Sequence, residues 1–257
     1  MEYVTLYEQI YTYCLWTILI VSAVSFPVLF FITAPYGRHA NGSWGPGLPY
    51  NLGWFIMEMP AISVMPFVFF QGPYSTELVP MIIAGIWVAH YTYRLIFFPF
   101  LLQGKAKTKP VLAVGVGFIF NVINGFAMGY AIGHLGAHLT PEWLWEPRFI
   151  IGVLMMGLGF GICYHSDYVL RHLRKPGESG YKIPHGGFYR WVSSPNYLGE
   201  IIEWTGLALA SWSWAGLAFA LFTVANLFPR AFSHHRWYVE KFPDYPKDRK
   251  AILPKLL

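Results

Sequence analysis

The stretch PVLAVGVGFIFNVINGFAMGYAIGH, residues 110–134, contains no Asp, Glu, Lys or Arg. A helix needs about 20 apolar residues to cross the roughly 30 Å hydrocarbon core of a bilayer. Proline opens this stretch, and glycine and histidine close it, as is common at helix ends. The sequence therefore predicts a transmembrane helix here.

Six similar stretches lie on either side of this one. Together they give seven predicted spans, at about 10–34, 50–71, 79–103, 110–134, 148–166, 197–211 and 213–229. The last two are short and are joined by a turn around Trp212 and Trp214, so six spans with one long re-entrant segment is the alternative. Hydrophobic residues make up 55% of the chain and charged residues 12%, against about 25% charged in an average soluble domain. We predict one all-α integral membrane domain, residues 1–257, without internal repeats.

The basic residues predict the orientation of this domain. Of the 18 Lys and Arg, 16 fall in the segments 35–49, 104–109 and 167–196 and in the tail from 230, which share one side if there are seven spans. The exceptions are Arg94, within the third span, and Arg148. Because cytosolic loops are enriched in Lys and Arg, we predict an N-terminus outside, or lumenal, and a cytosolic C-terminus. The net charge of +5 is then a topology signal, and no nucleic-acid partner is expected.

Four charged residues lie where charge is costly. Glu58, Arg94, Glu200 and Glu203 all fall within predicted spans, where a charge costs on the order of 2.5–3.5 kcal/mol on insertion scales. Glu58 belongs to WFIMEMP, in which a proline can bend the helix, and Arg94 ends the motif HYTYR. These residues indicate a functional site, although a Glu58–Arg94 ion pair that only joins two helices is the structural alternative.

The C-terminal third carries three polar stripes with helical spacing. They are Asp167, Arg171 and Arg174; Asn196, Glu200 and Glu203; and Arg230, His234 and Tyr238. Cations suit phosphates, whereas carboxylates, amides and phenols suit ribose and amide groups, so the mixture favours a phosphorylated nucleotide cofactor. A solvated basic rim is the alternative, but it explains the glutamates poorly. His234 and His235 lack a convincing third and fourth ligand, so no metal is expected. Gly157, Gly159 and Gly161 are interpreted as helix-packing positions.

Over essentially its whole length the chain resembles the steroid 5α-reductase family. The resemblance is carried by HSDYVLRHLRKPGESGYKIPHGGFYRWVSSPNYLGEIIEWTGLALASWS, residues 165–213, and RAFSHHRWYVEKFPDYPKDRKAILP, residues 230–254, with WFIMEMP and HYTYR in the N-terminal half. It implies a seven-span enzyme that uses NADPH to reduce the 4,5 double bond of a 3-oxo-Δ4-steroid. It also implies a substrate side mainly within 1–135 and a cofactor-binding part mainly within 148–257.

The resemblance implies roles for individual residues. Glu58 and Tyr91 match the pair that engages the steroid C3 carbonyl. The implied cofactor-binding positions are Lys105, Cys163, Asp167, Arg174, Tyr181, Asn196, Glu200, Arg230, His234 and Tyr238. We expect the substrate pocket to include Trp54, Met57, Trp204, Phe219 and Phe222. The steroid is expected to enter from the bilayer and the cofactor from the cytosol. The protein is expected to function as a monomer, in the endoplasmic reticulum membrane of a eukaryote or the inner membrane of a bacterium.

Two positions depart from the family pattern. Met57 stands where androgen reductases of the family commonly have Gln, and Cys163 stands where Asn is expected. The role of Glu58 is also open, because it either orients the Tyr91 hydroxyl as a carboxylate or donates a proton as a neutral acid. The alternatives to a steroid reductase are a polyprenal or enoyl-thioester reductase, a membrane methyltransferase, and a transporter or sterol-binding protein without chemistry.

Overall fold

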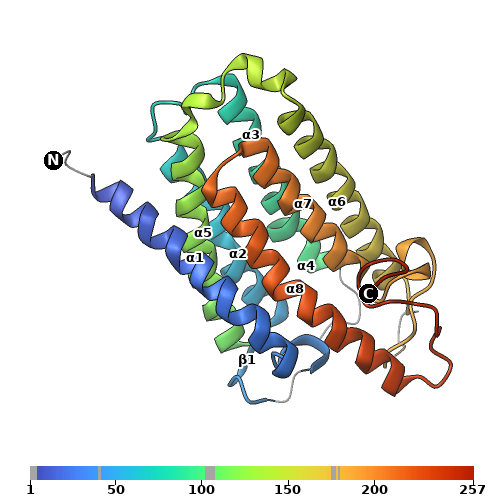
Figure 1. The fold of residues 1–257 in the computed structure, drawn as a ribbon. Coiled ribbons are helices and arrows are strands. Elements are labelled where there is room, and N and C mark those ends of the chain that lie inside the picture. The colour runs from blue at the N-terminus through green and yellow to red at the C-terminus, as the bar shows by residue number, and fades with distance from the viewer. Residues whose placement is uncertain (1–4, 40–41, 102–107, 175–177, 179) are drawn as a thin grey trace.

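The fold is a bundle of long helices that run roughly alongside one another (Figure 1). It comes from a computed structural model that describes residues 5–39, 42–101, 108–174, 178 and 180–257. The long helices are α1 (Leu6–Phe31), α2 (Tyr50–Phe69), α3 (Leu78–Thr92), α5 (Val111–Gly133), α6 (Pro147–Arg171), α7 (Pro195–Ser211) and α8 (Trp214–Lys241). They follow the seven predicted spans in order, so the all-α membrane fold is confirmed.

Six helical segments in the described part of the chain are long and apolar enough to cross a membrane. The remaining long helix, α7, has 17 residues and carries Glu200 and Glu203. It is a separate helix because Trp212 adopts a left-handed conformation (φ 44°) directly after it, and α8 then begins at Trp214 with Ser213 as its N-cap. The chain is therefore a multi-pass membrane protein in which one short, polar helix is enclosed by longer ones.

Three helix pairs make the most extensive contacts, namely α6 with α7, α2 with α5, and α1 with α8. Glycine allows α6 and α7 to approach closely, because a Cβ on Gly159 would lie 2.5 Å from the backbone of α7. By contrast, a Cβ on Gly157 or Gly161 would meet nothing within 4 Å. Of the three glycines interpreted as packing positions, Gly159 is the one that packs.

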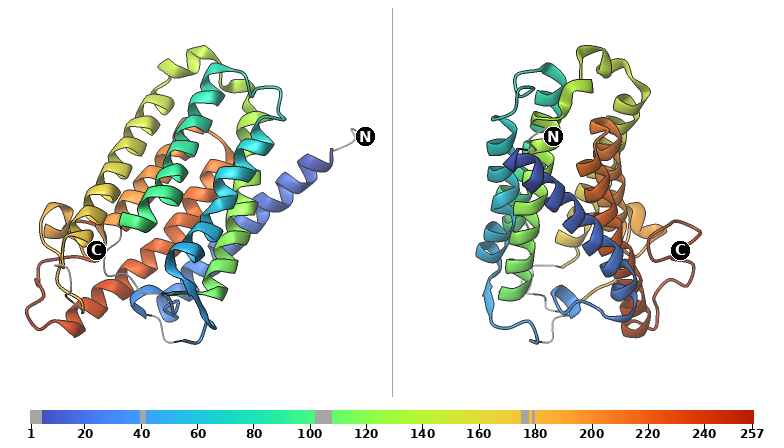
Figure 2. Two further views of the ribbon diagram at one scale, coloured as in Figure 1. Left: turned by 180° about the vertical axis from the view of Figure 1, so that it is seen from behind. Right: turned by 60° about the vertical axis from the view of Figure 1, so that its left-hand side comes forward.

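The polar connections gather at one end of the bundle (Figures 1 and 2). They include the 3₁₀ helix η1 (Gly37–His39), the antiparallel pair β1 (Gly47–Pro49) and β2 (Thr108–Pro110), and the 3₁₀ helix η5 (Gly187–Arg190). The C-terminal tail folds back over this end, where the Ser193 hydroxyl contacts His235, Tyr245 and the Lys250 carbonyl. The opposite end carries the connections η3 (Gly136–His138) and η4 (Pro141–Trp145).

Three helices differ from the predicted spans in ways that affect the site. After Thr92 the chain changes to a π-helical segment, η2 (Tyr93–Phe97), followed by the short α4 (Phe98–Leu101). Helix α8 extends to Lys241, well beyond the predicted end at 229, so Arg230 and His234 project from a continuous helix. Helix α6 ends at Arg171, which leaves Arg174 beyond the helix and outside the predicted stripe.

Candidate active site

An arginine between two glutamates lies at the centre of the bundle. Arg94 Nη2 is 3.8 Å from Glu58 Oε1, and its Nη1 is 3.5 Å from Glu200 Oε1. The three residues come from η2, α2 and α7, which are far apart in sequence. The predicted Glu58–Arg94 pair is therefore present, but it is one side of a larger arrangement that includes Glu200. We call Glu58, Arg94 and Glu200 the charged triad.

The π-helical turn aims Arg94 at this point. A π-helix inserts an extra residue into the helical repeat, which turns the side chains that follow it. The Arg94 carbonyl accepts a 2.8 Å hydrogen bond from Trp54 Nε1, and its guanidinium lies 4.7 Å from the centre of the Trp54 ring. The Lys109 ammonium lies 4.2 Å from the same ring. The indole of Trp54 thus contacts two cations beside Glu58.

An asparagine on α5 also holds Glu58, and the sequence analysis did not single it out. Asn121 Nδ2 donates a 2.7 Å hydrogen bond to the Met57 carbonyl and lies 3.4 Å from Glu58 Oε2. The Met57 side chain points elsewhere, with its sulfur 3.4 Å from Lys109 Nζ. The only sequence signal for Asn121 was an amide in an otherwise apolar span.

Tyr91 is buried next to a contact between a histidine and a glutamate. His90 Nδ1 is 2.6 Å from Glu203 Oε1, and this contact joins α3 to α7. The Tyr91 ring stacks on Trp204 with their centres 6.0 Å apart, and Trp87 lies 4.7 Å from it. Charges near the Tyr91 hydroxyl include Glu58, Arg94 and Glu200. The two residues expected to polarise a carbonyl, Glu58 and Tyr91, are therefore neighbours.

The predicted aromatic lining surrounds Tyr91. Trp204 and Phe219 have ring centres 4.6 Å apart, and Phe219 also lies 5.7 Å from Trp87. Phe222 stacks on Phe120 of α5 with a centre distance of 3.8 Å. Trp204 and Phe219 are buried and Phe222 is half-buried. These rings make an apolar region on the Tyr91 side of the site.

The residues predicted to bind the inner part of the cofactor lie where α6 meets α7. Cys163 Sγ donates a hydrogen bond to the Asn196 carbonyl at 3.0 Å. The thiol that stands in place of the expected Asn amide therefore links α6 to α7. Asp167 is buried one turn further along α6. Arg171, which follows it at the end of α6, reaches the Tyr93 hydroxyl at 3.5 Å.

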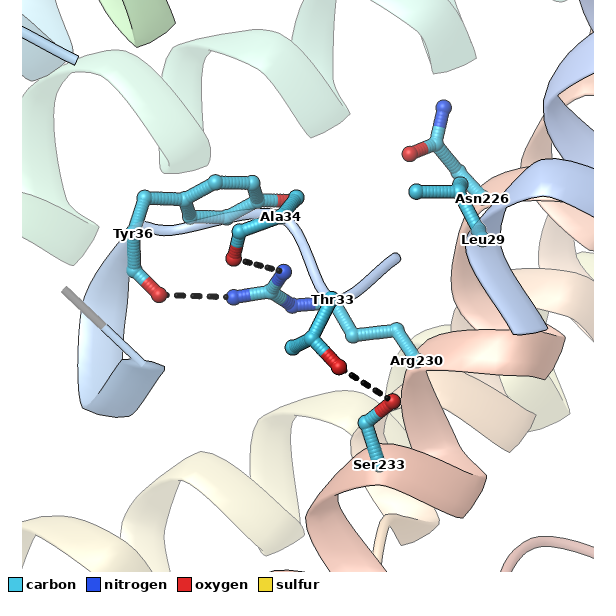
Figure 3. Close-up of a pocket in the computed structure, with 7 residues that line it drawn as sticks. All are labelled: Leu29, Thr33, Ala34, Tyr36, Asn226, Arg230 and Ser233. Atoms are coloured by element: carbon cyan, nitrogen blue, oxygen red, sulfur yellow. Dashed lines mark hydrogen bonds between the residues drawn. The ribbon is translucent and has the colours of Figure 1, made fainter. Parts of the chain in front are cut away.

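Arg230 is fixed between α8 and the chain that follows α1 (Figure 3). Its guanidinium donates to the Tyr36 carbonyl at 3.0 Å and to the Ala34 carbonyl at 3.4 Å, and it lies 3.6 Å from the centre of the Tyr36 ring. Its Nε donates to the Tyr197 hydroxyl at 3.2 Å. Thr33 and Ser233 exchange a hydrogen bond beside it. The pocket in Figure 3 is lined by these groups together with Leu29 and Asn226.

Unpaired nitrogen atoms collect next to Arg230. Arg38 Nη1, His39 Nε2 and His234 Nε2 are buried and have no hydrogen-bond partner among the described residues. The rings of His39 and His234 stack at 5.3 Å. Burial, then Arg230 and Arg38, lower the pKa of His39 to about 4. We call Arg38, His39, Arg230 and His234 the basic cluster.

Tyr181 and Tyr238, two other predicted cofactor residues, lie beside the basic cluster. The Arg38 guanidinium lies 4.7 Å from the Tyr238 ring, 5.9 Å from the Tyr181 ring and 5.2 Å from the Trp237 ring. Arg174 instead donates to the Gly180 carbonyl at 3.0 Å. Lys105 lies outside the described residues. Arg38 and His39 were not predicted, and their position in a loop gave the sequence no periodic signal.

Comparison with known proteins identifies the family. A family model described as 3-oxo-5-alpha-steroid 4-dehydrogenase matches residues 107–257, which is more than half of the chain. The chain is 41% identical over 239 residues to 3-oxo-5-alpha-steroid 4-dehydrogenase 1 of Bos taurus, covering 91% of this chain and 92% of that protein. The chain belongs to the 3-oxo-5-alpha-steroid 4-dehydrogenase family. It is also 39% identical to Steroid 5-alpha-reductase DET2 of Gossypium hirsutum over 96% of this chain and 97% of that one.

Membership of the 3-oxo-5-alpha-steroid 4-dehydrogenase family makes the chain a member of an oxidoreductase family. This member brings its predicted residues together in two places, the charged triad with its aromatic lining and the basic cluster. Within the described residues there is no group of three or more His, Cys, Asp or Glu placed to hold a metal ion.

Proposed function

We propose that this chain reduces the 4,5 double bond of 3-oxo-Δ4-steroids to 5α-dihydrosteroids, with NADPH as the hydride donor. The observation that carries the proposal is that Tyr91 and Glu58 are both buried and interact electrostatically beside an aromatic region of a membrane-spanning bundle. A sterol skeleton partitions into lipid and packs well against such rings. The names of the relatives, which are steroid reductases and dehydrogenases, agree with this chemistry.

On the substrate side, the protein supplies a hydrogen-bond donor that polarises the substrate carbonyl, and apolar surroundings that exclude water. The Tyr91 hydroxyl donates to the C3 oxygen, on which negative charge builds as hydride adds to C5. Before the steroid binds, Glu58 accepts the single hydrogen of the Tyr91 hydroxyl and holds this hydroxyl in place; the same hydrogen then turns to the C3 oxygen of the bound substrate. Hydride addition to C5 leaves an enolate, which takes a proton at C4 from a water molecule after hydride transfer and returns to the ketone. Trp204, Phe219 and Phe222 exclude water during the hydride transfer itself.

The basic cluster is the proposed site for the cofactor phosphates. Three buried nitrogen atoms without partners among the described residues are costly unless a ligand accepts from them. Phosphate oxygens accept several such bonds at once, and an arginine can meet them with two parallel ones. The donors therefore fit the phosphates of NADPH, which supplies the hydride when bound. Tyr238 and Tyr181 offer ring faces beside Arg38, where a purine base can stack.

The inner end of the cofactor would lie along α6 and α7. Asp167, Asn196 and Glu200 provide acceptors and an amide between the basic cluster and the charged triad, and Cys163 holds the Asn196 backbone. Lys105 and Arg174 are proposed to contribute at the cytosolic entrance. In this arrangement the cofactor binds mainly to residues 148–257 and the steroid mainly to residues 1–135. Glu200, which lies in the cofactor-binding part, faces the substrate side.

The decisive experiment is an assay of the detergent-purified full chain. It should oxidise NADPH when given testosterone or progesterone, with the product resolved as 5α or 5β and NADH as the control cofactor. Formation of the 5α product with NADPH alone would establish the reaction and the phosphate preference. Tight NADPH binding without turnover would instead favour a polyprenal or enoyl-thioester substrate, and neither binding nor turnover would favour a transport or sterol-binding role. We propose that the protein acts as a monomer, in the endoplasmic reticulum membrane or a bacterial inner membrane.

A further inference from the structure

We propose that Asn121 is a positioning residue for this reduction, and that its amide holds Glu58 as a hydrogen-bond acceptor facing Tyr91. The inference rests on the proposed function, because it gives Asn121 a task only if Glu58 and Tyr91 act on a carbonyl. Asn121 belongs to α5, whereas Glu58 belongs to α2, so the contact is made across the interface between these two helices.

The two hydrogen atoms of one amide nitrogen serve two acceptors. One reaches the Met57 carbonyl, with Nδ2 2.7 Å from that oxygen, and fixes the turn of α2 that carries Glu58. The other faces Glu58 Oε2, 3.4 Å from the nitrogen. Asn121 is itself only 6% exposed, so water does not compete for these bonds. Both the backbone and the side chain of the Met57–Glu58 turn are therefore held by a single group.

Donors then face Glu58 from two sides. Arg94 approaches Oε1 and Asn121 approaches Oε2. Hydrogen bonds to the charged form of a carboxyl favour that form, whereas a neutral acid would direct an O–H at another donor. Glu58 consequently serves as an acceptor, which leaves the Tyr91 hydroxyl as the group that donates to the substrate carbonyl. This assigns the role that the sequence left open between an orienting carboxylate and a neutral acid.

Two side chains close to Glu58 make other contacts. Met57 is a thioether, has no donor, and directs its sulfur to Lys109. Lys109 is turned towards that sulfur and the Trp54 ring. Asn121 therefore supplies from α5 a neutral N–H donor to Glu58 that the Met57 side chain does not offer.

Helix α5 contains its own control for this proposal. Asn124 lies one turn further along, is fully buried, and has neither amide atom hydrogen-bonded within the described residues. The same substitution at both positions removes a buried amide of equal size from the same helix. Replacing an amide that has no partner by an apolar side chain of similar shape is close to neutral for stability.

The experiment compares Asn121→Leu with Asn124→Leu in the full chain. We expect Asn121→Leu to lower kcat by about 10- to 100-fold, because a misplaced catalytic group loses rate steeply, while the NADPH dissociation constant stays within about twofold of the wild type. We expect Asn124→Leu to keep kcat within about twofold. Unchanged kcat in Asn121→Leu would overturn the proposal, as would an equal loss in both variants, since that pattern belongs to packing alone.

The variant Asn121→Asp adds a second measurement, the pH dependence of turnover, which a purely structural role of Asn121 would not change. The carboxyl introduced by this substitution can still donate to Glu58 when protonated, whereas it repels Glu58 when ionised. The titratable and charged groups around this point are Tyr50 and Glu58 of α2, Tyr91 of α3, Arg94 of η2, Lys109 of β2, Glu200 and Glu203 of α7 and Arg230 of α8. Turnover by Asn121→Asp should therefore fall relative to the wild type as the pH rises and the introduced carboxyl ionises, while Asn121→Leu stays uniformly slow. Parallel profiles for the two variants would overturn the proposal.

The wild-type assay separates this proposal from the proposed function. If the wild type binds NADPH but reduces no 3-oxo-Δ4-steroid, the proposed function fails and this inference fails with it. If the wild type turns over and Asn121→Leu matches it, the function stands and the role of Asn121 alone is refuted.

Discussion

Arg94 lies between two carboxylates that come from different helices, so its guanidinium interacts with two acids rather than one. Glu58 and Glu200 lie at 3.8 Å and 3.5 Å from its guanidinium, and neither pair has close bidentate geometry. Breaking a buried ion pair leaves an uncompensated charge, which is costly in an apolar surrounding. We therefore expect replacement of either glutamate by glutamine to leave Arg94 with one carboxylate partner rather than none.

Removal of one hydroxyl tests the role of Tyr91. Tyr91→Phe keeps the ring that stacks on Trp204 but removes the donor to the carbonyl oxygen. We expect kcat to fall by about 100- to 1,000-fold, the range seen when an oxyanion donor is deleted. NADPH affinity, measured by quenching of intrinsic fluorescence, should remain unchanged. Full turnover in Tyr91→Phe would remove this residue from the mechanism.

The basic cluster predicts a pH-dependent cofactor affinity. The pKa of His39 is lowered to about 4 by burial first, then by Arg230 and Arg38, so His39 is neutral at about pH 7. A bound phosphate counters those cations and raises the pKa of His39, so binding takes up a proton. NADPH affinity should therefore strengthen as the pH falls from about 6.5 towards 4.

The variant His39→Gln should flatten this dependence in a titration of NADPH binding against pH. His134→Gln is the matched control, because His134 caps α5 at the opposite end of the bundle. An identical slope in wild type and His39→Gln would show that His39 does not meet the phosphates.

The same shift affects stability without cofactor. A histidine whose pKa is lower in the folded protein than in the unfolded chain favours unfolding as the pH drops below about 6.5. This contribution to folding is present above that pH and is lost as the pH approaches the folded value of about 4.

Site residues that carry a charge within a predicted span could be predicted from the sequence, whereas some of the other site residues could not. Glu58 and Arg94 stand out in a sequence because each is costly in lipid unless paired. Asn121 does not stand out, because an uncharged amide within a span is often only a structural residue. Arg38 and His39 follow a helix in an irregular segment, where no repeat indicates which way a side chain points.

Among the helices, the α6–α7 pair controls the position of both glutamates of α7. Gly159 of α6 faces the α7 backbone at Gly199 and Glu203, each 2.5 Å from where its Cβ would lie. One heptad away, a Cβ on Gly152 would lie 2.6 Å from the Gly206 carbonyl. The two helices therefore meet backbone to backbone at two levels, and Glu200 and Glu203 are carried by this contact.

A single methyl group should separate the two helices. Gly159→Ala forces backbone apart, at a cost of about 1–3 kcal/mol, so we expect thermal unfolding in detergent several degrees lower and slower turnover. Gly157→Ala and Gly161→Ala are matched controls, because their new Cβ atoms meet nothing within 4 Å. Those variants should unfold at or slightly above the wild-type temperature. Equal melting of all three variants would contradict the proposed contact.

Helix positions were predictable from hydropathy, whereas their ends were less so. The start of α5 at Val111 agrees with the prolyl boundary predicted there. The extension of α8 to Lys241 was not foreseen, because its last three turns are polar and resemble a tail. The π-helical turn at Tyr93–Phe97 has no signature in the sequence and is set by the contacts of Arg94 and Trp54.

The basic residues of the whole molecule gather mainly at one end. Figure 1 places the segment after α1, the segment between α6 and α7 and the C-terminal tail at the same end of the bundle. These are segments in which the sequence concentrates its Lys and Arg. The arrangement agrees with seven spans, while the side of the membrane that this end faces stays a prediction.

Reporter fusions test this orientation. A fluorescent protein fused to the C-terminus should fold and emit, because that end is predicted to be cytosolic. Alkaline phosphatase at the same position should be inactive in a bacterial host, and a tag at the N-terminus should be accessible from outside. An active C-terminal phosphatase fusion would reverse the orientation and place the basic cluster away from cytosolic NADPH.

The short helix α7 has a consequence for the order in which the protein is made. Synthesis delivers α2 and α3 first, and these neighbours bring one acid and one base, Glu58 and Arg94, that can enter lipid as a matched hairpin. His90 lacks its partner Glu203, and Arg94 lacks its second partner Glu200, until α7 has been synthesised. This short helix is therefore drawn into the membrane by partners that are already there, and α8, which carries Arg230 and His234, follows it to complete the site.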